Sequence, residues 1–123
     1  MENRSVFINL SNHPSHLWSD AQREAATRLG EIVDMKFPTI DASASDDEVA
    51  QLVKESVDAV MELAATAQVT VHVMGEMVFT HRVVCELKSH GLRCVASTTE
   101  RVVTTNDDGT KTSAFRFERF RDY

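Results

Sequence analysis

Short β-rich runs alternate with segments of helical periodicity along most of this chain, and this alternation limits the possible folds more than any other feature. Strand-like runs are predicted at residues 6–10, 31–37, 69–75 and 92–97, and helices at 20–29, 46–65 and 77–90. Ser19 and Ser45 each precede a glutamine or glutamate by three residues, which is the pattern of a capping box. Gly30 and Gly91 follow predicted helices as stop signals. Strands joined through helices favour a mainly parallel sheet covered on both faces.

The end of the chain has a different pattern. Residues 102–120, VVTTNDDGTKTSAFRFERF, carry two β-rich arms around Asp107, Asp108 and Gly109, which is typical of a hairpin. We therefore expect an α/β fold whose sheet has about four parallel strands, flanking helices and two further antiparallel strands in a C-terminal hairpin. The 123 residues, 1–123, are expected to form a single domain.

The charge of the chain argues against a binder of long nucleic acids. The net charge is −6, whereas neutralising many phosphates requires a broad basic surface. No apolar stretch approaches the roughly 18 residues that span a bilayer, so we expect no membrane association and a cytoplasmic location. Cys85 and Cys94 lack CxxC or CxxH spacing and are expected to be buried free thiols.

The sequence also argues against the common metal and cofactor sites. His13 and His16 are spaced so that they could share a metal ion, but no third ligand lies nearby in the sequence. The motifs GxxxxGK[ST], GxGxxG, GxSxG and HExxH are absent. We therefore expect neither a metal nor a cofactor.

Polar clusters follow three of the predicted strands. They are NLSNHPSHLW at 9–18, MGEMVFTHR at 74–82 and ASTTER at 96–101. Because the carboxyl ends of parallel strands share one edge of a sheet, we expect the three clusters to surround one concavity. The candidate site residues in them are Ser11, Asn12, His13, Ser15, Trp18, Gly75, Glu76, Thr98, Thr99, Glu100 and Arg101.

Each cluster also has a purely structural explanation. The first can be a turn with Trp18 packed over the following helix. Gly75 can serve only a tight turn, and Glu76 can be a negative charge that the dipole favours at a helix N-terminus. Glu100 and Arg101 can be a solvated ion pair. In the strand pattern VTVHV, we interpret His72 as a hydrogen-bonded sheet position and not as a catalytic group.

Four segments of the chain resemble a known protein family. They are NLSNHPS with Trp18 and Gln22 behind it, MGEMVFT, ASTTER and the closing aromatic stretch FRFERFRDY. Together they resemble short CRISPR-associated proteins of the CARF-like, Rossmann-like type, in particular the standalone ring nucleases. The resemblance implies a Rossmann-like fold, a homodimer and the binding of cyclic oligoadenylates, the second messengers of type III CRISPR antiviral defence. It also implies cleavage of the ring, which silences the signal.

The residues fit the chemistry that this resemblance implies. An RNA phosphodiester carries its own nucleophile, the neighbouring 2′-hydroxyl, so the protein has only to align it, move protons and stabilise charge. His13 is the natural acid or base, with Glu76 or Glu100 as its partner. Contacts to phosphate, ribose or base are expected from Ser11, Asn12, Ser15, Trp18, Gly75, Thr98, Thr99 and Arg101. The alternatives are a sensor that binds the ring without cleaving it and a mononucleotide-binding Rossmann-like domain.

Overall fold

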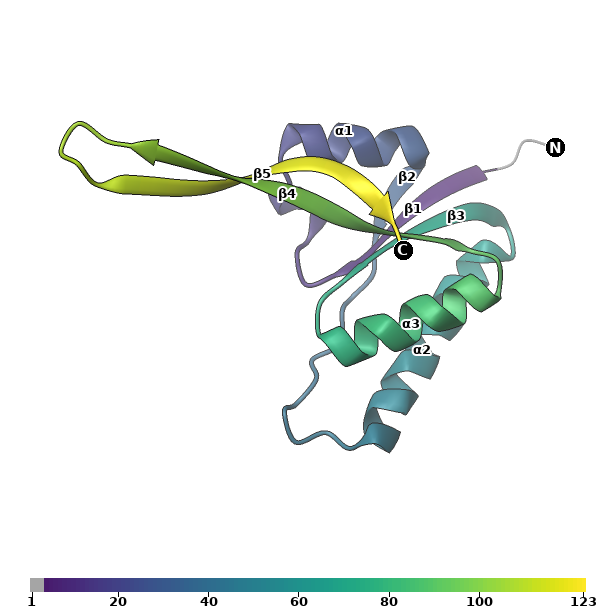
Figure 1. Cartoon of the computed structure of the whole chain (residues 1–123). Helices are drawn as coiled ribbons and strands as arrows, with labels where there is room; N and C mark the ends of the chain where they lie inside the picture. Colours follow the sequence, from purple (N-terminus) through teal and green to yellow (C-terminus); the bar gives the residue numbers. More distant parts are fainter. Residues whose placement is uncertain (1–3) are drawn as a thin grey trace.

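The computed structural model describes residues 4–123 as a mixed α/β protein with a curled five-stranded sheet and three helices (Figure 1). In chain order the elements are β1 (Arg4–Ser11), the short 3-10 helix η1 (Ser15–Leu17), α1 (Asp20–Leu29), β2 (Glu31–Asp34), α2 (Asp46–Ala64), β3 (Ala67–Met74), α3 (Met77–Ser89), β4 (Arg93–Thr105) and β5 (Lys111–Asp122). The sheet order is β2-β1-β3-β4-β5, in which the first four strands are parallel and β5 is antiparallel to β4. The expected mainly parallel sheet with a C-terminal hairpin is confirmed.

The helix boundaries follow the capping signals in the sequence, and all three helices match their predicted bounds to within one residue. The Ser19 side chain accepts a hydrogen bond from the backbone N–H of Gln22, and Ser45 and Glu48 form a reciprocal capping box at α2. Gly91 follows α3 with φ of 80°, a left-handed conformation that glycine adopts without steric cost. Among the described residues, no helix is long and apolar enough to cross a membrane.

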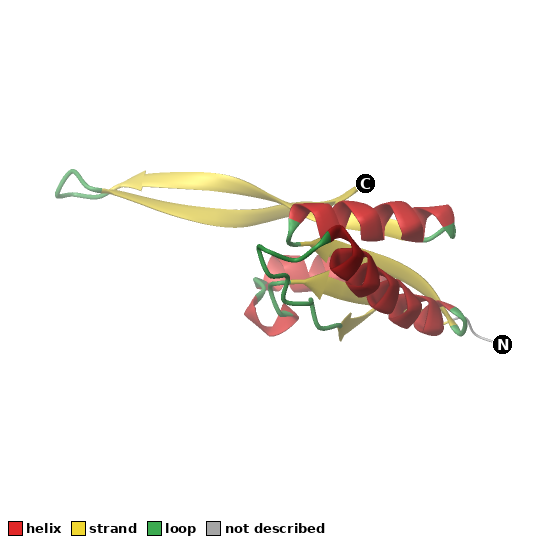
Figure 2. Ribbon diagram, turned by 90° about the horizontal axis from the view of Figure 1, so that it is seen from below, coloured by secondary structure: helices red, strands yellow, loops and turns green. Residues whose placement is uncertain are grey.

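Alternate residues of β1 divide the core between the two faces of the sheet. Val6, Ile8 and Leu10 are fully buried in a cluster with side chains of α2 and α3. Phe7 is buried in a second cluster on the other face, which includes side chains of α1. One helix therefore covers one face and two helices cover the other (Figure 1, Figure 2). The alternation places Asn9, the next residue on the side of Phe7, toward α1.

β4 differs most from the prediction. The strand predicted at 92–97 and the first arm of the predicted hairpin are one continuous strand, so the hairpin adds one strand to the sheet and not two. The segment contains no glycine or proline, and its β-branched residues continue directly into pairing with β5. The polar cluster at 96–101 was expected to follow the fourth strand, and this is wrong, because all six residues lie within β4. β2 is also shorter than predicted and ends at Asp34.

The outer parts of β4 and β5 leave the body of the protein as a two-stranded ribbon (Figure 1, Figure 2). We call residues 99–117 the arm. β3 pairs with β4 only from Arg93 to Val95, whereas β5 pairs with β4 as far as Thr105. Large apolar side chains of the arm are open to solvent, since Phe115 is 73% and Val103 50% exposed. An isolated two-stranded ribbon is marginally stable in water, so the arm depends on its continuity with the sheet.

Candidate functional site

The carboxyl ends of β1 and β3 lie side by side at one edge of the sheet. Ser11 is the register partner of Met74, and the backbone N–H of Asn12 donates to the backbone oxygen of Met74 at 3.4 Å. The loop after β1 therefore starts beside Gly75, as the parallel strands predicted. This edge lies where the strand order changes direction, between β1 and β3.

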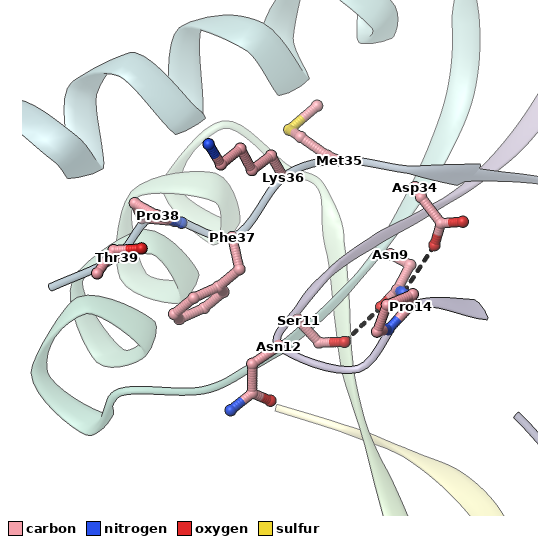
Figure 3. Close-up of a pocket in the computed structure, with 10 residues that line it drawn as sticks. All are labelled: Asn9, Ser11, Asn12, Pro14, Asp34, Met35, Lys36, Phe37, Pro38 and Thr39. Atoms are coloured by element: carbon pink, nitrogen blue, oxygen red, sulfur yellow. Dashed lines mark hydrogen bonds between the residues drawn. The ribbon is translucent and has the colours of Figure 1, made fainter. Parts of the chain in front are cut away.

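Asn9 holds the loop after β1 in place. Its side chain is 1% exposed, and its amide nitrogen donates to the backbone oxygen of His13 and to Oδ1 of Asp34, both at 2.9 Å. The amide oxygen accepts from Ser11 Oγ at 2.7 Å and pairs with His72 Nδ1 at 3.0 Å. Figure 3 shows the bonds from Asn9 to Ser11 and Asp34. Because both neighbours of the nitrogen can only accept, the orientation of the amide is determined.

Asp34, at the end of β2, binds the later part of this loop at Ser15. Its carboxylate accepts from the backbone N–H and the hydroxyl of Ser15, at 3.1 and 2.7 Å. Partial burial acts to raise the pKa of Asp34, but the hydrogen bonds from Ser15 and Asn9 outweigh it and hold the pKa below its usual value. Ser11 and Ser15 are each only 7% exposed, so their hydroxyls build the loop. Asp34 was not predicted as a site residue, because the strand predicted at 31–37 places it in mid-strand and not at a strand end.

A cavity of about 760 Å³ opens between this loop, the start of α1 and the base of the arm. We call it the carboxyl-edge cavity. Its lining includes His13 and Trp18 from the loop, His72 from β3, Ser97 and Thr99 from β4, and Phe115, Arg116 and Phe117 from β5. Mixed apolar walls with a few convergent polar groups are typical of small-molecule sites. The expected meeting of the first cluster with the third is thus confirmed for His13 and Thr99, whereas Gly75 does not line this cavity.

His72 is the buried titratable group of this cavity. It is 2% exposed and packs against the rings of Phe7, Trp18 and Phe120, with centroids 5.4 to 6.2 Å away. Burial, with a smaller effect of the charge on His13, lowers the pKa of His72 to about 4, so its imidazole is neutral near pH 7. The interpretation as a hydrogen-bonded sheet position is confirmed, but it missed that the same ring lines the cavity.

Gly75 and Glu76 have structural partners outside this cavity. The carboxylate of Glu76 accepts from the backbone N–H groups of Val78 and Phe79, at 3.1 and 2.7 Å, and so caps α3. The ring of Phe37 lies against the Cα of Gly75, where a Cβ atom would collide with it. Packing under an aromatic ring, and not a tight turn, therefore explains this glycine.

A second cavity, of about 410 Å³, lies between the loop after β1 and residues 35–39 (Figure 3). Asn12 and Pro14 line it from the loop, and the side chains of Asn9, Ser11 and Asp34 form its inner wall. The polar groups of that wall are already joined to one another by the hydrogen bonds described above. Unlike the carboxyl-edge cavity, it contains no histidine among its lining residues.

The residues from Thr98 to Arg101 have different surroundings because side chains alternate along β4. Thr98 donates its hydroxyl to a backbone oxygen of β5 at 3.1 Å, while Thr99 lines the carboxyl-edge cavity. Glu100 forms an exposed ion pair with Arg116 at 3.4 Å. Arg101 donates to a serine hydroxyl across the arm, at 3.0 and 3.3 Å. Of these four predicted contacts, only Thr99 lines the cavity.

Neither thiol lines the carboxyl-edge cavity. Cys94 is buried, as predicted, but the prediction is wrong for Cys85, which is exposed because it lies on the outer face of α3. Within residues 4–123, no three histidine, cysteine or carboxylate side chains are grouped so that they could hold a metal ion. A ligand in the carboxyl-edge cavity therefore meets imidazoles, hydroxyls and aromatic rings; Arg116 also lines the cavity, but its guanidinium is paired with Glu100.

Comparison with known proteins adds the family. The search of curated proteins finds no match. A family model matches residues 5–121, which is nearly the whole chain. The chain therefore belongs to the family described as the Uncharacterized protein MJ1673 family.

Proposed function

We propose that this protein is a metal-independent ring nuclease that binds and cleaves a cyclic oligoadenylate. The observation that carries the proposal is that His13, Trp18 and Thr99, from the first and third polar clusters, line one cavity at the carboxyl edge of the sheet. The strand order, with its change of direction between β1 and β3, supports a Rossmann-like, CARF-like classification, since such sheets bind ligands beyond that switch point. The proposed role is in type III CRISPR antiviral defence, in the cytoplasm.

The cavity has the groups that this reaction needs. Trp18 and Phe117 offer ring faces on which adenine can stack, and a phosphate can compete with Glu100 for the positive charge of Arg116. An in-line attack by the ribose 2′-hydroxyl needs one proton removed and one supplied, and leaves a 2′,3′-cyclic phosphate. His13 is exposed at the cavity wall and supplies the proton to the leaving 5′-oxygen. Because Glu76 caps α3, its carboxylate is less available for this role.

A homodimer is part of the proposal. A ring of identical nucleotides is rotationally symmetric, so a two-fold dimer presents the same loop to opposite sides of it. In the register of β4 and β5, Phe115 lies opposite Arg101. Val103 follows Arg101 by two residues, so Phe115 and Val103 lie on the same face of the arm. This apolar face continues from the cavity lining, and we place it over the cavity of a second copy. Phe115→Ser should therefore shift the mass measured by light scattering from dimer toward monomer, and a wild-type monomer at the same concentration contradicts the dimer.

Cleavage in EDTA tests the function directly. Purified protein is incubated with labelled cyclic tri-, tetra- and hexaadenylate, and products are separated by chromatography. Wild-type protein should cleave one ring size in EDTA, and His13→Ala should lower the single-turnover rate by about 100-fold or more with little change in ligand binding. His16→Ala is the matched control, because His16 lies in the same loop but does not line the cavity.

The result distinguishes the proposed function from its alternatives. Retention of the ring without cleavage would identify a sensor, which hands the signal to a partner. Neither binding nor cleavage would favour a mononucleotide-binding domain. An unchanged rate in His13→Ala would remove His13 from the mechanism while leaving the ligand assignment intact.

A further inference from the structure

Three polar side chains are lined up across three neighbouring parallel strands. Asn9 of β1 and His72 of β3 are register partners, with Oδ1 of Asn9 3.0 Å from Nδ1 of His72. On the other side of the imidazole, Nε2 lies 3.3 Å from Oγ of Ser97 in β4. All three side chains project from the face that α1 covers, and the row ends at the carboxyl-edge cavity.

The protonation of this row follows from its hydrogen bonds. The amide nitrogen of Asn9 faces two acceptors, so the atom that faces His72 is the amide oxygen. An oxygen accepts, and Nδ1 of His72 must therefore carry the proton. Since the imidazole is neutral, Nε2 has a lone pair, which faces the hydroxyl of Ser97.

Exposure decides which member of the row a ligand can touch. His72 and Ser97 both line the cavity, but His72 is 2% exposed, whereas Ser97 is only half-buried and is the more accessible of the two. The other neighbour of the Ser97 hydroxyl is the sulfur of Met74, at 3.0 Å, which is a weak acceptor. Ser97 can thus donate to Nε2 while its oxygen accepts a hydrogen bond from a group in the cavity.

We propose that Ser97, His72 and Asn9 form a proton relay that accepts the proton of a ligand hydroxyl in the carboxyl-edge cavity. This inference rests on the proposed function, in which that hydroxyl is the ribose 2′-hydroxyl. Its proton passes to Oγ of Ser97 while the Ser97 proton passes to Nε2 of His72. The bond from the 2′-oxygen to phosphorus forms and the bond from phosphorus to the 5′-oxygen breaks. His13 gives its proton to the leaving 5′-oxygen, and exchange with water resets both imidazoles.

The surroundings of the two histidines suit these opposite roles. His72 is kept neutral by burial, while His13 is exposed to solvent, and a positive charge on His13 further disfavours a second charge on His72. Ser97 is the catalytic residue in this relay, and His72 and Asn9 are positioning residues.

The test compares two variants of Ser97, one of His72 and one of a serine elsewhere in the chain under single-turnover conditions. Ser97→Ala should lower the cleavage rate by about 100-fold while changing the dissociation constant for the same cyclic adenylate by less than about threefold. Ser97→Thr keeps the hydroxyl and should restore most of the rate. Ser89→Ala is the control, because Ser89 lies at the end of α3 and its hydroxyl donates to a backbone oxygen there. His72→Gln should lose rate as Ser97→Ala does.

A spectroscopic readout on the wild type covers the case in which His72→Gln does not fold. Long-range proton–nitrogen NMR of protein with labelled histidine should show His72 protonated at Nδ1 and not at Nε2. Protonation at Nε2 overturns the relay. Wild-type cleavage with equal rates in Ser97→Ala and Ser89→Ala overturns the relay and leaves the proposed function standing. Wild-type protein that cleaves no cyclic adenylate overturns both.

Discussion

Replacing Asn9 with alanine is expected to destabilise the protein by about 3 kcal/mol. The Nδ1–H of His72 loses its acceptor, and because His72 is 2% exposed, this unsatisfied donor costs roughly 1 to 3 kcal/mol. The hydrogen bond to the Asp34 carboxylate is lost as well. Bonds to charged groups contribute about 1.5 to 3 kcal/mol, and we take the low end of this range because water reaches Asp34.

The assay is thermal unfolding at pH 7, followed by circular dichroism. A loss of about 3 kcal/mol lowers the unfolding midpoint by roughly 10 °C in a chain of this length. Asn12→Ala is the matched control, because Asn12 is exposed on the same loop and its side chain makes no hydrogen bond with the described residues. The control should change stability by less than about 0.5 kcal/mol. Equal small losses in both variants would show that the contacts of Asn9 do not hold this edge of the sheet.

NMR titration of the His72 imidazole should give a midpoint near pH 4, because burial lowers its pKa to about 4. This pKa lies below the unfolded value of 6.5, so between about pH 4 and 6.5 the unfolded chain binds more protons than the folded chain. The stability that neutral His72 contributes is therefore complete above pH 6.5 and is lost as the pH falls toward 4. A midpoint near 6.5 would contradict the buried environment. A thiol reagent should modify exposed Cys85 quickly and Cys94 only on unfolding, because burial raises the pKa of Cys94 to about 11; rapid reaction of both thiols in the native protein would refute this. Arg101→Ala should leave the binding of the cyclic adenylate unchanged at low salt, because Arg101 does not line the cavity and its guanidinium donates to Ser113 across the arm. Weaker binding, with the largest loss at low salt, would instead show an electrostatic contact of Arg101 with a phosphate.

The order of strands and helices was predictable because local signals and burial agree along most of the chain. Ser45 and Glu48 mark the start of α2, and the β-rich pattern around Val71 marks a central strand. The course of β4 was not predictable in the same way. Thr98 and Thr99 suit both a polar loop and a strand, and only pairing with a distant segment decides between them.

The residues of the candidate site were also predictable only in part. Periodicity indicated that the neighbours of His72 are buried, but it could not reveal that Asn9 lies opposite His72, because register between distant strands is a tertiary property. Asp34 was missed for this reason too, since its partners come from β1 and the following loop. By contrast, the proximity of His13 and Thr99 was predictable from topology alone, because both lie beyond the parallel-paired parts of β1 and β4, at the same edge of the sheet.

The single strand β4 spans two very different levels of local stability. Around Cys94 and Val95 it is buried and has a strand on each side, whereas toward Thr105 it has only β5 as a neighbour. Amide hydrogens near Val95 should therefore exchange with solvent only when the whole protein unfolds, while those near Thr105 exchange through local opening of the ribbon. The gradient of exchange rates along one strand thus measures how far the order of the sheet extends into the arm. Slower exchange beyond Thr99 on adding a cyclic adenylate would report directly that the arm becomes ordered around the proposed ligand.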